Sequence, residues 1–157
     1  MMTFRRGTRL GVDVGKARVG VARCDPDGML AVPIETVPRS DVAAKRVAEL
    51  ADEYSAFEIL VGLPISLAGG ETASTADARA FAAEIAALAD LPIRLVDERL
   101  STVTAHAALR QSGRSQKSSR RIVDQVAAVV LLQQAIDVEK STGNPAGQLL
   151  SPTQEPA

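Results

Sequence analysis

Three carboxylates stand out because their neighbours in the chain are apolar or basic: Asp13, Glu98 and Asp124. Asp13 lies between two valines in a segment with the composition of a buried strand, and an ionised carboxylate is costly to bury unless it is paired or bound to a cation. Three oxygen ligands without histidine or cysteine suit the hard cations Mg²⁺ and Mn²⁺. Asp97, beside Glu98, is a fourth candidate ligand. Two such ions can activate water and stabilise the leaving oxygen of a phosphodiester.

Each carboxylate also has a purely structural interpretation. Asp13 could accept hydrogen bonds from backbone N–H groups of the turn that follows it. Glu98 and Asp124 could each stabilise the start of a helix or form an ion pair, Glu98 with Arg99 and Asp124 with Arg120 or Arg121. The residues alone leave these interpretations open, but two isolated carboxylates in apolar elements favour a shared explanation.

The stretch between Glu98 and Asp124 contains no acidic residue and is rich in arginine and lysine. Charge runs on solvated helices normally mix both signs, so this one-sided charge favours a phosphate-binding surface over an ordinary solvated face. The formal net charge of −1 gives no such indication for the whole chain. The predicted nucleic-acid-binding residues are Lys16, Arg18, Arg99, Arg114, Lys117, Arg120 and Arg121.

The elements that must position these residues follow from periodicity and turn signals. Their order predicts an α/β fold with a mixed five-stranded sheet, strand order 3-2-1-4-5, the second strand antiparallel and helices on both faces. Pro33 cannot donate to a ladder, which places the third strand at an edge. Asp13, Gly62 and Glu98 then lie near the carboxyl ends of parallel strands, where open α/β sheets build their sites. The predicted strands are 9–14, 18–24, 29–37, 57–61 and 92–96, and the predicted helices are about 40–54, 75–88, 101–113 and 119–140.

Four motifs occur in order along the chain: LGVDVGKARVGVA (10–22), VGLP (61–64), VDERLST (96–102) and VDQVAA (123–128). Together they resemble the YqgF family, of the RuvX type, over residues 9 to about 138. The resemblance implies a ribonuclease H-like fold related to bacterial Holliday junction resolvases. It also implies a Mg²⁺- or Mn²⁺-dependent nuclease with Asp13, Glu98 and Asp124 at the acidic positions, acting on the 5′ end of pre-16S rRNA. Members of the family have alternatively been viewed as Holliday junction resolvases.

Two other classes of function compete with a nuclease. Asp13-Val14-Gly15 followed by Gly20 also resembles the phosphate hairpin of actin-like and sugar-kinase ATPases, but those enzymes clamp nucleotide between two such domains and 157 residues supply one. A non-catalytic ribosome-assembly or transcription factor could keep the same fold, although retention of all three carboxylates argues against it. The residues do not decide between an RNA precursor and a four-way DNA junction as substrate.

Length and composition predict a single nuclease domain over 1–140 and a disordered polar tail over 141–157. Cys24 is the only cysteine, which excludes an intrachain disulfide. The chain shows no signal core and no membrane-length apolar run, so we expect a cytoplasmic protein. The expected partners are structured RNA or branched DNA and ribosomal precursor particles, with no membrane, and the expected state is a monomer or weak homodimer.

Overall fold

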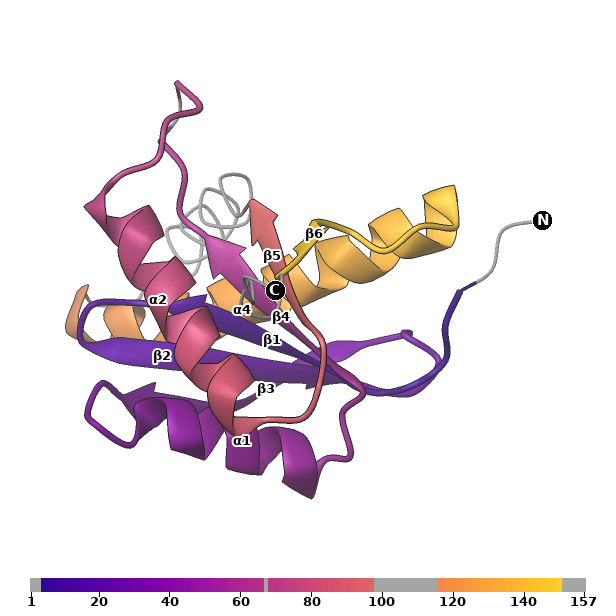
Figure 1. The fold of residues 1–157 in the computed structure, drawn as a ribbon, viewed down its shortest axis with the longest axis horizontal. Coiled ribbons are helices and arrows are strands. Elements are labelled where there is room, and N and C mark those ends of the chain that lie inside the picture. Colours follow the sequence, from indigo (N-terminus) through magenta and orange to yellow (C-terminus); the bar gives the residue numbers. More distant parts are fainter. Residues whose placement is uncertain (1–3, 67, 98–115, 151–157) are drawn as a thin grey trace, which may run out of the picture.

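The computed structural model describes residues 4–66, 68–97 and 116–150, with the backbone alone over 116–124. These residues form a six-stranded sheet in the order β3-β2-β1-β4-β5-β6, with helices on both faces (Figure 1). Strands β1, β4 and β5 are parallel, whereas β2, β3 and β6 join the sheet through antiparallel pairs. The elements are Arg9–Val14 (β1), Arg18–Cys24 (β2), Ala31–Pro38 (β3), Ala43–Glu53 (α1), Glu58–Leu63 (β4), Ala73–Leu88 (α2), Ile93–Asp97 (β5), Gln116–Thr142 (α4) and Gln148–Leu149 (β6).

The predicted fold class and the strand order 3-2-1-4-5 are confirmed, and β1 and β2 have their predicted bounds. β3 lies at the edge of the sheet, where Pro33 needs no ladder partner on its outer side. The turn between β2 and β3 is held by the Asp25 carboxylate, which accepts hydrogen bonds from the N–H groups of Met29 and Leu30 at 2.8 and 2.7 Å. The three antiparallel strands β3, β2 and β1 follow one another in the sheet, so β1 lies at its centre.

Alternation along β1 gives the sheet two different faces. Leu10, Val12 and Val14 are buried in the larger core, which α1 and α2 cover. Gly11 faces α4, which packs on the opposite side of the sheet (Figure 1). A Cβ on Gly11 would lie 2.8 Å from Leu132 Cβ, so only glycine lets α4 approach this closely.

The two helices on the face of the sheet opposite α4, α1 and α2, begin in different ways. We predicted Ser40 as the cap of the first helix, but α1 begins at Ala43 with Val42 in the cap position. The Ser40 hydroxyl instead accepts a hydrogen bond from the Val42 N–H at 3.2 Å, which forms a local turn before the helix. α2 begins with a capping box between Thr72 and Thr75.

The C-terminal part of the described chain adds a strand that the sequence pattern did not indicate. The predicted tail starts at 141, whereas α4 extends to Thr142 and β6 pairs antiparallel with β5. Gly143 and Gly147 both have positive φ, which lets the chain reverse after the helix and return to the sheet. The Leu150 N–H then donates to the Ile93 carbonyl at 2.7 Å. The sheet therefore has six strands, and β5 is not its edge.

The helix predicted over about 101–113 lies outside the described residues. None of the described helices, α4 included, combines the length and the apolar character needed to cross a membrane.

Candidate active site

Asp13 is the penultimate residue of β1 and is buried, with 8 % of its surface exposed. It lies two residues after Gly11, so its side chain is on the face of the sheet that α4 covers. Its cross-strand partner is Gly20. Because Gly20 has no side chain, the cross-strand neighbour does not fill the space beside the Asp13 carboxylate. A carboxylate is thus held on a rigid central strand at the carboxyl end of the parallel strands.

The backbone of α4 brings position 124 to the level of Asp13. Ala128 and Leu132 are the α4 residues nearest to Gly11, and position 124 precedes Ala128 by four residues in the same row of the helix. One such step along a helix and a two-residue step along a strand are both about 6–7 Å, so position 124 approaches Asp13 as Ala128 approaches Gly11.

A second contact fixes the same level independently. Gln125 donates from Nε2 to the Thr36 hydroxyl on β3 at 2.6 Å. Thr36 pairs with Gly20, which in turn pairs with Asp13, so the three residues form one row across the sheet. The residue next to Asp124 therefore lies over the row that contains Asp13.

Asp97 does not share this face. It is the exposed last residue of β5 and pairs with Leu63, whose side chain belongs to the core under α1 and α2. Paired residues of neighbouring strands point to the same face, so Asp97 and Asp13 lie on opposite faces. Glu98 lies outside the described residues, and of Asp124 only the backbone is described. Among the described side chains, no three that could ligate a metal ion come together.

The predicted phosphate-binding residues divide between described and undescribed parts of the chain. Lys16 is exposed in the turn after β1, and Arg18, the half-buried first residue of β2, follows it at the same end of the sheet as Asp13. Three more lie on the first turns of α4, where the backbone alone is described: Lys117, Arg120 and Arg121. Arg99 and Arg114 lie outside the described residues.

One residue that shapes this end of the sheet was missed from the sequence. Arg39 donates to both carboxylate oxygens of Asp77 at 2.9 and 3.0 Å and to the Gly15 carbonyl at 2.8 Å. These bonds lower the pKa of Asp77, with the charge of Lys16 contributing further. Arg39 thereby ties the turn after Asp13 to α2. No local pattern marks it, because its partners lie 24 and 38 residues away.

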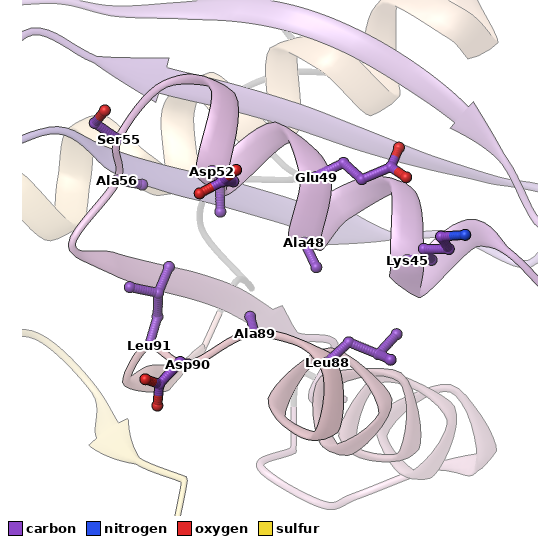
Figure 2. Close-up of a pocket in the computed structure, with 11 residues that line it drawn as sticks. Lys45, Ala48, Glu49, Asp52, Ser55, Ala56, Leu88, Ala89, Asp90 and Leu91 are labelled. Carbon is purple, nitrogen blue, oxygen red and sulfur yellow. The ribbon is translucent and has the colours of Figure 1, made fainter.

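A groove of about 550 Å³ lies on the other face of the sheet, between α1 and the end of α2 (Figure 2). Alanines form much of its wall, and the carboxylates of Glu49, Asp52 and Asp90 lie around it. None of the predicted site residues that the structure describes lines this groove. The region around Asp13 is therefore the candidate site.

The chain resembles known proteins along nearly all of its length. Residues 7–138 match the RuvX family, which is described as a Holliday junction resolvase family. A candidate pre-16S rRNA nuclease of Streptomyces coelicolor is 54 % identical over 148 residues, which cover 92 % of this chain and 89 % of that protein. A relative of the same description from Clavibacter michiganensis is 50 % identical over 150 residues, covering 94 % and 93 %. Thermus thermophilus RuvC, solved with a Holliday junction substrate, matches with a TM-score of 0.56 and 16 % identity over 92 % of this chain and 99 % of that chain.

Proposed function

This chain belongs to the RuvX family, a nuclease family, and from that premise we propose that it hydrolyses phosphodiester bonds at the 5′ end of pre-16S rRNA with Mg²⁺ or Mn²⁺. Asp13, Glu98 and Asp124 are the catalytic residues of this proposal and hold the metal. The single observation that carries it is a buried carboxylate, Asp13, at the carboxyl end of the central parallel strand and facing α4 at the level of position 124.

The donor set fits the proposed metal. Asp13 offers oxygen ligands from a rigid strand, and the residues proposed to join it also offer only carboxylate oxygens, the ligands that Mg²⁺ and Mn²⁺ favour. Ions of this kind, when bound, activate a water molecule and stabilise the leaving oxygen of a phosphodiester. Asp97 is omitted from the proposed ligands because it lies on the other face of the sheet.

In this proposal, basic residues of the chain bind the phosphates of the substrate. Lys16 and Arg18, at the end of the sheet beside Asp13, bind backbone phosphates on one side of the site. Arg99, Arg114, Lys117, Arg120 and Arg121 extend this contact in the proposal. Contacts of this kind orient the backbone without reading sequence, so recognition rests on the shape of the nucleic acid.

The test is cleavage of two substrates side by side, with Mg²⁺ and with Mn²⁺. One is an RNA that spans the 5′ end of 16S rRNA and its precursor leader, and the other is a synthetic four-way DNA junction. The variant Asp13→Asn keeps the shape of the side chain and removes the charge. The matched control is Asp90→Asn, an exposed carboxylate by the groove on the other face.

The proposal expects the wild-type protein and Asp90→Asn to cleave the RNA at the mature 5′ end, and Asp13→Asn to be inactive. Cleavage of the junction in preference to the RNA favours a resolvase, the second candidate, which the description of the family supports. Absence of cleavage on both substrates with both metals contradicts the proposal and favours a non-catalytic assembly factor.

A further inference from the structure

A network of buried charges lies at the other end of β1, far from the candidate site. Glu139 of α4 accepts hydrogen bonds from the Arg5 guanidinium at 2.7 and 3.0 Å and from Arg9 of β1 at 3.2 Å. Glu58 of β4 accepts from Arg5 at 3.0 and 3.2 Å and from Arg94 of β5 at 2.8 Å. Arg9, Glu58 and Glu139 are all at most 3 % exposed.

From this network we infer that Glu139 is a positioning residue: its bonds to Arg5 and Arg9 fix α4 along β1 so that position 124 stays beside Asp13. The inference rests on the proposed role of Asp13 and Asp124. Glu139 and position 124 lie on the same helix, about 22 Å apart along α4 at 1.5 Å per residue.

One stripe of α4 connects the two ends. Positions 124, 128, 132, 135 and 139 follow each other at steps of three or four residues, which is the spacing of a single helix face. Ala128, Leu132, Ala135 and Glu139 are all buried in the described part of this stripe. A shift of α4 along its axis would therefore move Glu139 and position 124 together.

The residues of β1 and β2 that pack under the middle of α4 are small. Gly11, Gly20 and Ala22 lie on this face of β1 and β2, and Leu132 packs closely over Gly11. Apolar contacts are non-directional, whereas hydrogen bonds fix the position of a helix along its axis, as the bond from Gln125 to Thr36 does near the site. The ion pairs at Glu139 are directional, since a guanidinium fixes the geometry of the carboxylate it binds.

The Arg9 side chain is itself held rigidly. Its guanidinium lies 4.5 Å from the centre of the Phe4 ring and 4.7 Å from that of Phe57, and it also donates to the Arg5 carbonyl at 2.7 Å. A donor fixed in this way defines one place for the Glu139 carboxylate. The end of α4 opposite the site thus has a fixed anchor on the same strand that carries Asp13.

The test compares Glu139→Gln, which keeps the shape and loses the charge, with a variant of similar stability loss elsewhere. Ile85→Ala is suitable because Ile85 is fully buried in α2, on the other face of the sheet, and such a truncation costs about 2–5 kcal/mol. Three kinds of measurement are made at a temperature at which both variants are folded: cleavage kinetics (kcat and KM), the Kd for Mn²⁺, and the backbone amide chemical shifts of Gly11 and Gly20. These glycines lie under α4, so their shifts report its position without any need for activity.

We expect Glu139→Gln to move the Gly11 and Gly20 amide resonances, to weaken Mn²⁺ binding, and to lower kcat by about 100-fold with little change in KM, as for a displacement of about 1 Å in an active site. Ile85→Ala should leave all three near wild type. Equal effects of the two variants, or unmoved glycine resonances in Glu139→Gln, would overturn the inference. If the wild-type protein cleaves neither substrate, the proposed function fails, and the glycine resonances still decide whether Glu139 fixes the helix.

Discussion

The two ends of β1 both carry charged residues beneath α4, but the charges are arranged in opposite ways. At the amino end, Arg5 and Arg9 neutralise Glu58 and Glu139 through buried and partly buried hydrogen bonds of 2.7–3.2 Å. At the carboxyl end lies Asp13, and the residues proposed to join it add charge of the same sign. Paired charges stabilise one arrangement of the fold, whereas like charges held together repel and need a cation. The difference predicts that substitutions at the amino end reduce stability, and function only by displacing α4, whereas substitutions at the carboxyl end reduce function without loss of stability.

The largest expected effect on stability comes from breaking the paired end. Glu139→Ala leaves Arg9, which is 1 % exposed, without its carboxylate partner. An uncompensated buried charge destabilises by about 3–5 kcal/mol, measurable as the free energy of unfolding in urea. The double variant Arg9→Met with Glu139→Leu replaces both charges by apolar groups and should recover most of that loss. A loss below about 1 kcal/mol in Glu139→Ala would show that the network contributes little.

Low pH should destabilise the fold through the charges at the amino end of β1. Burial opposes ionisation of Glu139, but the hydrogen bonds from Arg5 and the charge of Arg9 outweigh it and lower its pKa to about 2. A carboxyl with a pKa below its unfolded value of about 4.3 contributes stability that is complete above that value and is lost as the pH falls toward 2. The contribution is on the order of 3 kcal/mol. Unfolding free energies measured from neutral to acid pH should fall more steeply for the wild type than for Glu139→Gln, and equal slopes would contradict this pKa.

A smaller effect is expected where α4 meets the middle of β1. In Gly11→Ala the added Cβ would lie 2.8 Å from Leu132 Cβ and 3.0 Å from the Ala128 carbonyl oxygen. The helix must then move away, which should cost about 1–3 kcal/mol in unfolding free energy. Combining Gly11→Ala with Leu132→Ala does not remove the clash, because alanine keeps the Cβ that the added methyl group meets. The double variant should therefore be no more stable than Gly11→Ala, and an unchanged stability of Gly11→Ala would contradict the close packing.

The sequence was informative where the relevant interactions are local. Alternation and turn residues identified β1 and β2, and Pro33 identified the edge of the sheet. The start of α1 was wrong because the Ser40 side chain bonds within a turn rather than at the helix. β6 was missed because a strand of two residues is too short to show an alternating hydrophobic pattern. The two glycines that return the chain to the sheet also fit the composition of a polar tail.

The charged network could not be found in this way. Arg5 is separated from Glu58 by 53 residues and from Glu139 by 134, and each residue has the appearance of an ordinary surface charge in its own segment. Asp13 was easier, because a carboxylate inside an apolar strand conflicts with its surroundings, and its burial is confirmed. The participation of Glu98 and Asp124 stays a prediction.

The smallest effect on stability is expected at the carboxyl end, and it tests the central claim that carboxylates are held together there to bind metal. If Asp124 lies beside Asp13 and Glu98, Asp124→Asn removes one of three repelling charges and keeps the shape. If Asp124 instead caps or pairs within α4, the same change loses a charged hydrogen bond and destabilises by about 1–3 kcal/mol.

The decisive measurement is the thermal unfolding midpoint of Asp124→Asn in EDTA and in Mn²⁺, together with its cleavage activity. The account predicts a midpoint in EDTA that is unchanged or higher than that of the wild type, a smaller rise on addition of Mn²⁺, and loss of cleavage. A lower midpoint in EDTA with cleavage retained would contradict it.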